Sequence, residues 1–406
     1  MKKELFAFLS IKLIPAGVNF LLIPLLFRVF GPEVYGQFSL AQSLAMLFVT
    51  VFTGFFIHSI YRYFVKEAVN KYYSLAVIVS CFAFVLAMFI FSFLDVTRVV
   101  FNLMVALFIA ASSCYTLLLI VVQLIGSKAS LAMLEFLRIV SLLCLLGVIS
   151  YVKVDFEVGS YISLILCAYF LSYLLPLVFI LVKFPHLKLV KFEWGWVLKH
   201  IKFGAKIACW LILVTFYWYF AKLFVEHNYS AEQLGTFSAL FDLVYKVVSL
   251  IGSAFTMYLY PKVSELTEQK NVKAILAVIN KALSYYFFVS LGILILSLLI
   301  GPFVLYIVLK ENYTFGVIAA ITCPLLIIQA SVVLQKPLEV AGLMWWLLLG
   351  MLISIASTLL VLLLLFNDIT DFKVLFGYGY TSGSVIYFVF VLVLLKYSPI
   401  WHKREV

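Results

Sequence analysis

Long apolar stretches dominate this chain and restrict it to structures that can exist inside a membrane. A transmembrane helix needs about 20 mostly apolar residues. Hydrophobic residues make up 66% of the sequence and charged residues 12%, whereas soluble domains carry about 25% charged residues. The sequence therefore predicts an all-α integral membrane protein with about twelve transmembrane helices. The predicted spans lie at roughly 6–28, 36–60, 74–94, 99–124, 131–151, 160–182, 204–225, 234–260, 282–309, 315–334, 342–366 and 375–396.

A short motif occurs twice, once in each half of the chain. Residues 31–41 read GPEVYGQFSLA and residues 230–240 read SAEQLGTFSAL. The identities keep one offset, 235 − 36 = 199. They pair Glu33 with Glu232, Gly36 with Gly235, Phe38 with Phe237 and Ser39 with Ser238. Because each motif leads into a long apolar run, we expect an internal duplication of the kind found in two-lobed transporters.

The duplication predicts two six-helix lobes. Six is an even number, so both halves enter the membrane in the same orientation and the repeat is parallel. We expect an N-terminal lobe at 1–185 and a C-terminal lobe with a short cytoplasmic tail at 204–406. The connection at 186–203 combines lysines with aromatic residues, which is typical of an amphipathic helix on the inner membrane surface.

Lysine and arginine favour the connections on one side of the predicted membrane. The positive-inside rule then places both termini in the cytoplasm. The net charge of +11 follows from this distribution, so it does not indicate nucleic-acid binding.

Sequence motifs for enzymatic chemistry are absent. The chain contains no GxxxxGK[ST] phosphate-binding loop, no HExxH and no GxSxG, so neither ATP hydrolysis nor another catalytic reaction is predicted. The six cysteines are scattered through apolar runs without a CxxC pair or a histidine cluster. They are interpreted as small membrane-buried residues, and no metal or cofactor is expected.

Three segments resemble a known family of membrane proteins. They are PLLFRVFGPEVYGQFSLAQSL at 24–44, AEQLGTFSAL at 231–240 and PKVSEL at 261–266. These segments are similar to bacterial oligosaccharide flippases, the O-antigen-type, Wzx-like polysaccharide biosynthesis proteins of the multidrug/oligosaccharidyl-lipid/polysaccharide exporter superfamily. One departure stands out: where that family often has Asp-Arg, this chain has Ala221 and Lys222, so coupling through an acid at that place is in doubt.

The resemblance implies a flippase of the bacterial cytoplasmic (inner) membrane. Such a protein moves an undecaprenyl-diphosphate-linked oligosaccharide, such as an O-antigen repeat unit of lipopolysaccharide, between leaflets by alternating access. Its expected partners are the lipid-linked substrate, membrane lipids, a coupling H⁺ or Na⁺, and the polysaccharide polymerase. A cation-coupled multidrug exporter of the same superfamily is the alternative, and a membrane-embedded polysaccharide polymerase or ligase is a weaker one.

Polar residues inside the spans are the candidate functional groups, because a charge at the bilayer centre costs roughly 2.5–3.5 kcal/mol on insertion scales. Lys222 and Lys246 are expected to face a central cavity and hold an anionic head group. Asp242 lies one turn before Lys246. It would adjust the charge of Lys246 or bind a coupling ion. The alternative is that the two residues only neutralise each other. The predicted cavity residues are Arg28, Lys222, Asp242, Lys246, Asn19 and Gln42.

Purely structural roles stay open as alternatives for several of these residues. Arg28 could snorkel to headgroups, and Asn19 and Gln42 could tie helices together. A cytoplasmic gate is predicted from residues near the inner ends of the first two spans, with an ordinary membrane-edge position as the alternative. The predicted gate residues are Lys12, His58 and Arg62.

Overall fold

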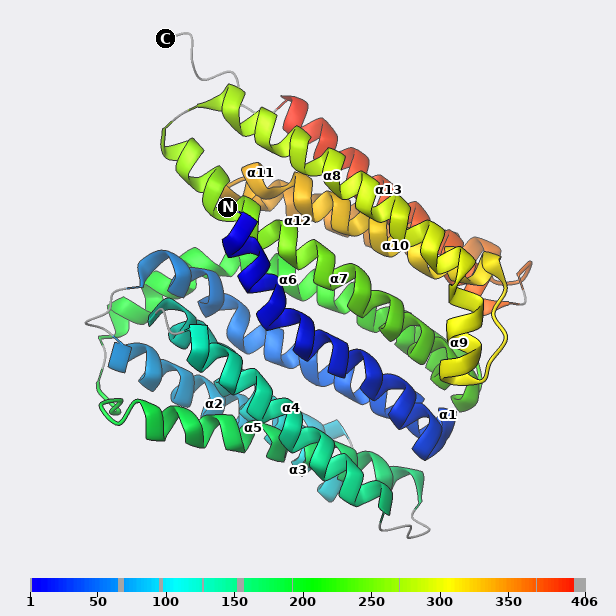
Figure 1. Cartoon of the computed structure of the whole chain (residues 1–406), viewed down its shortest axis with the longest axis horizontal. Helices are drawn as coiled ribbons and strands as arrows, with labels where there is room; N and C mark the ends of the chain where they lie inside the picture. The colour runs from blue at the N-terminus through cyan, green and yellow to red at the C-terminus, as the bar shows by residue number, and fades with distance from the viewer. Residues whose placement is uncertain are drawn as a thin grey trace. The chain divides into compact units, whose positions relative to one another are not determined.

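The computed structural model describes an all-helical chain. It describes the backbone of residues 2–64, 69–94, 98–125, 128–151, 157–191, 193–269, 271–369 and 371–397, and within these ranges it leaves out the side chains of 2–16, 94, 128, 257, 260, 261 and 268. Every regular element in the described part is a helix (Figure 1). The helices are α1 (Lys2–Tyr63), α2 (Val69–Leu94), α3 (Val99–Ile125), α4 (Lys128–Tyr151), α5 (Val158–Lys183), α6 (Trp194–Asn228), α7 (Ala231–Glu268), α8 (Val272–Leu299), α9 (Gly301–Leu309), α10 (Phe315–Leu334), α11 (Lys336–Val340), α12 (Met344–Leu365) and α13 (Phe372–Tyr397).

The prediction of a multi-span membrane protein is confirmed. Among the described residues, 11 helices are long and apolar enough to cross a membrane. One of them covers Gly17–Tyr63 and is broken at Gly31, whose φ of 85° is not helical. Glycine tolerates this conformation and the proline that follows is suited to a helix start. The first two predicted spans therefore meet at Gly31, which accounts for the twelfth span.

Span boundaries were predictable where the flanks are polar or contain helix stop signals. The predicted span 315–334 coincides with α10 at both ends. In contrast, the span expected at 282–309 begins ten residues earlier, at Val272, because the Asn271 side chain caps the helix by accepting from the Ala274 N–H (3.1 Å). That first part contains lysines, so its polarity concealed the helix start. The same run breaks before Gly301, and α9 follows.

The connection between the predicted lobes differs from the expected amphipathic helix. Residues 184–191 are not helical. The next helix, α6, begins at Trp194 and continues without interruption through the predicted seventh span. The non-helical part lies along α2, because the backbone N–H groups of Lys188 and Val190 donate to Asn70 Oδ1 (3.0 Å) and Ser74 Oγ (2.8 Å). These backbone groups thus find partners without forming a helix.

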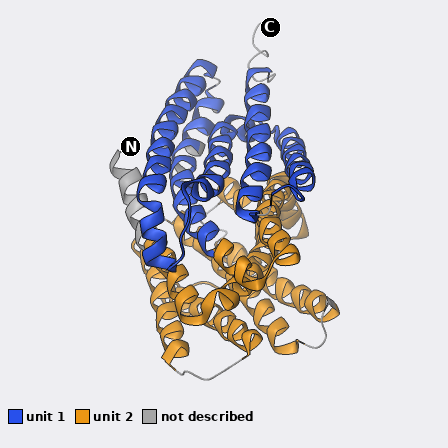
Figure 2. Cartoon of the chain, turned by 90° about the vertical axis from the view of Figure 1, so that its right-hand side faces the viewer, with its two compact units in different colours: residues 1–16, 239–406 blue, residues 17–238 orange. Residues whose placement is uncertain are grey.

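The chain forms two compact units, shown in different colours in Figure 2. We define the N-terminal unit as Gly17–Ser238 and the C-terminal unit as Ala239–Val406 together with Met1–Ala16. In the N-terminal unit α2 packs on α3, α3 on α5 and α5 on α4. In the C-terminal unit α8 packs on α10, α10 on α13 and α13 on α12. The two units thus repeat one order of helix packing, as the predicted duplication requires. The expected lobe limits at 185 and 204 stay a prediction.

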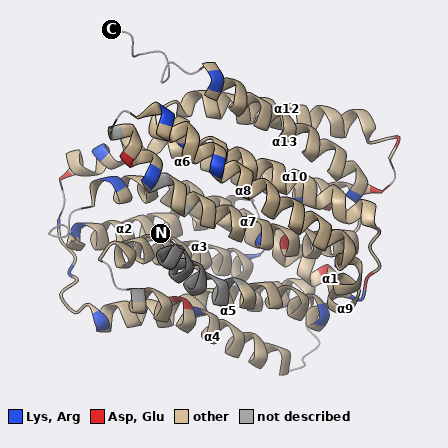
Figure 3. Cartoon of the chain, turned by 45° about the horizontal axis from the view of Figure 1, so that its top comes forward, with Lys and Arg blue, Asp and Glu red and all other residues tan. Residues whose placement is uncertain are grey.

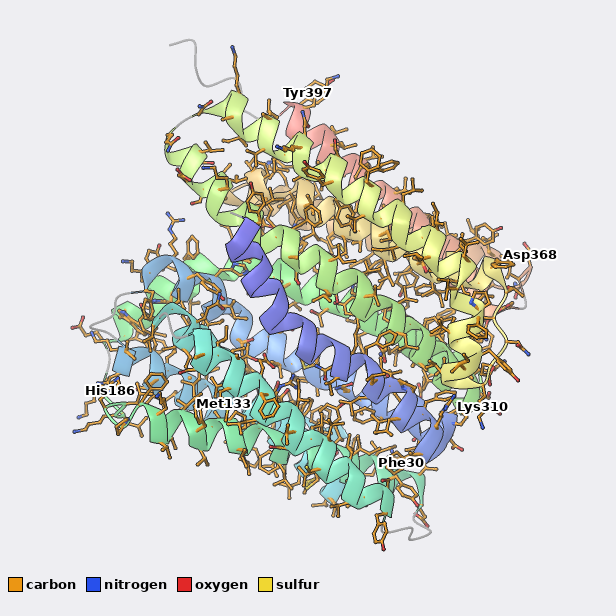
Figure 4. The ribbon with its side chains drawn as sticks, in the orientation of Figure 1. Phe30, Met133, His186, Lys310, Asp368 and Tyr397 are labelled. Carbon is orange, nitrogen blue, oxygen red and sulfur yellow. The ribbon has the colours of Figure 1, made fainter. Side chains whose placement is uncertain are left out.

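Within each unit the chain alternates between two ends. In the N-terminal unit Phe30 and His186 lie at opposite ends, and in the C-terminal unit Lys310 and Asp368 lie toward one end and Tyr397 toward the other (Figure 4). Lysine and arginine gather mainly at helix ends and connections (Figure 3). This arrangement suits helices that cross a bilayer with their charges near its surfaces.

Close glycine contacts hold the N-terminal unit together. A methyl group added to Gly36 on α1 would lie 2.6 Å from the backbone N of Gly235 on α7, and one added to Gly235 would collide with the carbonyl O of Pro32. Gly204 on α6 similarly meets the carbonyl O of Phe55. Small residues allow transmembrane helices to approach this closely. The two glycines that the sequence repeat equates therefore meet in one helix crossing.

Candidate functional site

A pocket with charged walls lies in the N-terminal unit. It has a volume of about 1150 Å³ and is formed by α1, α5, α6 and the first turns of α3. Its polar lining comes from Gln37 on α1, Arg98 before α3, Glu157 before α5, and Tyr219 and Glu226 on α6. We call it the mixed-charge pocket. Its three charged residues are exposed, whereas Gln37 and Tyr219 are half-buried.

Local sequence explains why these side chains meet. Arg98 and Glu157 each precede the first residue of a helix, so the starts of α3 and α5 bring their charges to the same end of the unit. Glu157 occupies the N-cap position of α5 without capping the helix through its side chain. Tyr219 and Glu226 are seven residues apart, which places them on one face of α6. The part of the pocket wall that the structure describes therefore carries one cationic and two anionic side chains.

Lys222 is buried beside this pocket. Its side chain is on the same part of α6 as Tyr219 and Glu226, and the residue is only 3% exposed. Its Nζ donates hydrogen bonds to Ser39 Oγ (2.6 Å) and Ser43 Oγ (3.0 Å) of α1. A buried ammonium needs such acceptors. Position 221, where the resemblance led us to look for an acid, is a buried alanine.

The other predicted cavity residues do not join the mixed-charge pocket in the described part of the chain. Arg28 is exposed, and Asn19 and Gln42 are half-buried in the N-terminal unit. Asp242 and Lys246 are half-buried on α7, in the C-terminal unit. That these residues face one central cavity stays a prediction.

The predicted gate residues lie in differing surroundings. The Arg62 guanidinium lies 4.6 Å from the ring centroid of Phe203 on α6, a distance suited to a cation–π contact. Lys199 Nζ lies 4.4 Å from the Tyr63 ring centroid nearby. His58 is half-buried, and the side chain of Lys12 is outside the described residues. A gating role remains a prediction.

The C-terminal unit contains a buried charged network that sequence reasoning missed. Lys336 Nζ lies 2.7 and 2.9 Å from the two carboxylate oxygens of Glu339, and these side chains are 6% and 4% exposed. The same carboxylate accepts from Gln335 Nε2 (2.7 Å), whose Oε1 accepts from the Tyr387 hydroxyl (2.7 Å). The network joins the α10–α11 turn to α13. Its i, i+3 spacing was visible in the sequence, but its burial was not.

The C-terminal unit also has a groove of different character. It measures about 740 Å³ and lies between α8, α10 and α13. Its lining is almost wholly apolar, with Phe287, Leu291 and Phe388 among larger residues and Cys323 and Ala330 among small ones. We call it the apolar groove. The Tyr286 hydroxyl fastens α8 to α10 there by donating to the carbonyl of Leu326 (3.1 Å).

Metal-binding clusters are absent from the described residues, which contain no group of three or more His, Cys, Asp or Glu side chains placed to hold an ion.

Comparison with known proteins identifies the fold. A family model described as "Polysaccharide biosynthesis protein" matches residues 1–267. No curated protein matches the chain closely enough to count as a relative. An inward-facing multidrug resistance MATE family transporter of the MOP superfamily is 11% identical, with 96% of each chain covered and a TM-score of 0.73.

Two further solved structures are similar. The MATE multidrug transporter DinF-BH is 12% identical and has a TM-score of 0.70, with 98% of this chain and 96% of that chain covered. A MOP superfamily transporter from Pyrococcus furiosus is 13% identical and has a TM-score of 0.68, with the same coverage. At these identities the similarity establishes a two-lobed, multi-span fold of the MATE type and no particular substrate.

Proposed function

The chain belongs to the polysaccharide biosynthesis protein family, and from this premise we propose that it is a flippase for a polyprenyl-diphosphate-linked oligosaccharide. The family match over residues 1–267 carries the proposal. The substrate would be an undecaprenyl-diphosphate-linked repeat unit of O-antigen or another surface polysaccharide. Translocation would run from the cytoplasmic to the external leaflet of the bacterial inner membrane.

The mixed-charge pocket supports this proposal by its chemistry. A sugar chain presents many hydroxyl groups, and the Gln37 amide and the Glu157 and Glu226 carboxylates can bond to them. The Tyr219 ring adds an apolar surface with a polar tip. A hydrocarbon tail would find no such partners there, and it can stay in the surrounding lipid.

The cationic residues of the spans have a separate role in the proposal. Lys222, Lys246 and Arg28 would attract the diphosphate as the two lobes alternate between inward and outward states. Asp242 would tune Lys246 or take a coupling H⁺ or Na⁺. Both termini would lie in the cytoplasm, and contact with a polymerase would hand the product on.

A multidrug exporter is the second candidate, and one observation favours it. The described lining of the mixed-charge pocket has two carboxylates against one guanidinium, and cationic drugs prefer acidic surroundings. Two of the similar structures are multidrug transporters. For the Pyrococcus furiosus transporter, however, the reverse polarity of its binding pocket suggests a different function.

Reconstitution into vesicles separates the two functions. The full-length protein would be incorporated with a fluorescent polyprenyl-diphosphate disaccharide in one leaflet, and movement to the other leaflet would be followed by quenching from outside. We expect movement of the lipid-linked sugar and no transport of a cationic dye. Dye transport without movement of the lipid-linked sugar would replace the flippase by the exporter.

A further inference from the structure

We propose that the mixed-charge pocket binds the sugar part of the substrate and not its diphosphate, and that it favours amino-bearing or neutral sugars over acidic ones. This inference rests on the proposed flippase function and specifies its substrate class. It differs from the expectation of a single cationic cavity, because the described charges on the pocket wall are mostly negative.

The charge balance of the described lining disfavours the diphosphate. Among the lining residues that the structure describes, Glu157 and Glu226 outnumber Arg98. A diphosphate or a sugar carboxylate would approach like charges there, which is unfavourable. A protonated amino sugar would instead meet two carboxylates. An uncharged sugar would not be repelled by the carboxylates, since its hydroxyl groups donate hydrogen bonds to carboxylate oxygens.

The nearest cation on α6 is kept apart from the pocket. Lys222 stands three residues after Tyr219 and four before Glu226, yet its ammonium is directed to Ser39 and Ser43 of α1. Those serines belong to the same stretch of α1 as the lining residues Leu40 and Leu44. The i, i+3, i+7 spacing places Lys222 on the same face of α6 as Tyr219 and Glu226, so it is the hydrogen bonds to α1 that hold its ammonium outside the described pocket lining.

The size of the pocket fits a glycan. Pockets for drug-sized ligands measure about 300–1,000 Å³, and this one measures about 1150 Å³. It can hold more than one sugar ring. The lining comes from four segments, α1, α5, α6 and the start of α3. Several hydroxyl groups of one sugar ring can therefore be contacted at once.

The test compares three lipid-linked disaccharides that differ only in their terminal sugar: glucosamine, glucose or glucuronic acid. The full-length protein would be reconstituted in vesicles and each compound's rate of movement measured. For the unchanged protein we expect glucosamine first, glucose second and glucuronic acid last. In the Glu157→Gln, Glu226→Gln double variant the ratio of glucosamine to glucuronic acid should fall by about tenfold, as expected when charge-assisted hydrogen bonds become neutral ones.

Two further variants test whether the pocket charges set the sugar preference. Arg98→Gln removes the cation of the pocket and should increase discrimination against glucuronic acid. Glu265→Gln changes an exposed glutamate of α7 outside the pocket and should leave the order of the three sugars unchanged. An unchanged ratio in the double variant would overturn the proposal. Equal slowing of all three compounds, with loss of a dependence on pH or Na⁺, would also overturn it by showing that the glutamates serve a coupling cation.

Failure of the flippase function gives a different result. In that case the unchanged protein moves none of the three compounds. Binding of the soluble disaccharides, measured by calorimetry on the purified protein, would then test the pocket independently. A preference for glucosamine that disappears in the double variant would sustain the sugar site, and equal affinity for all three sugars would refute it.

Discussion

The mixed-charge pocket and the apolar groove lie in two units that share one order of helix packing, yet they differ in chemistry. The pocket of the N-terminal unit is lined by Arg98, Glu157 and Glu226. The groove of the C-terminal unit is lined by aliphatic and aromatic residues around Cys323 and Ala330. The helices α3 and α5 border the first, and α10 and α13, which hold the corresponding places in the packing order, border the second. The same order of helix packing thus carries surfaces of different chemistry in the two units.

The charges of the mixed-charge pocket and those of the Lys336–Glu339 network also differ in exposure. In the N-terminal unit the charges of the pocket are exposed at its wall, where a ligand can reach them. In the C-terminal unit Lys336 and Glu339 are buried and bonded to each other and to neighbours. The first arrangement is suited to binding, and the second to holding a turn in one conformation.

The largest loss of stability is expected when the buried Lys336–Glu339 ion pair of the C-terminal unit is broken. Lys336→Met leaves the Glu339 carboxylate buried without its cation, which should cost about 3–5 kcal/mol of stability. The measurement is the free energy of unfolding of the purified full-length protein, supported by its thermal midpoint. A loss below about 1 kcal/mol would show that this network is dispensable.

The chain offers a matched control with the same spacing. Lys262 and Glu265 also form an i, i+3 pair (2.9 Å), but their side chains are 42% and 55% exposed. The hydrogen bond from Lys262 lowers the pKa of Glu265. Lys262→Met should nevertheless leave stability nearly unchanged, because solvent screens an exposed ion pair.

The next effect concerns the glycine crossing of the N-terminal unit. Gly235→Ala forces a methyl group against the backbone of Pro32, and overpacking of this kind costs about 1–3 kcal/mol. Gly292 on α8 of the C-terminal unit has open space around it. Gly292→Ala should therefore be neutral or stabilising by up to about 1 kcal/mol. Equal thermal midpoints for the two variants would contradict the close crossing.

Lys222 separates function from stability in the N-terminal unit. Lys222→Met should change stability by only about 1 kcal/mol, because Ser43 keeps its hydrogen bond to the Ser39 carbonyl (2.8 Å). Movement of the lipid-linked sugar should nonetheless fall by about tenfold, as expected when an anionic group loses a charged partner. Lys222→Arg, which keeps the charge, should be milder. Full transport by Lys222→Met would remove this residue from the mechanism.

The sequence was informative about the fold and less so about the site. Apolar length predicted the helical spans, and the Gly36–Gly235 repeat pointed to a duplicated packing order that the structure confirms. Lys222 was identified as important, but its partner Ser39 is 183 residues away, and no local pattern reveals such a contact. Glu157 and Glu226 sit at helix ends, where a charge is ordinary. Only the folded chain shows that both line one pocket.

The smallest expected effect tests whether the apolar groove is open space. Ala330 lines the groove on α10, so Ala330→Leu should add a side chain into it and change stability by less than about 0.5 kcal/mol. Ala320, on the same helix, is packed so tightly that a methyl group on Gly377 would collide with its side chain. Ala320→Leu should therefore cost about 1–3 kcal/mol. Neither change should alter the order of preference among glucosamine, glucose and glucuronic acid, because the charges that set this order lie in the other unit. A changed sugar preference in Ala330→Leu would mean that the charges of the mixed-charge pocket do not alone set this order.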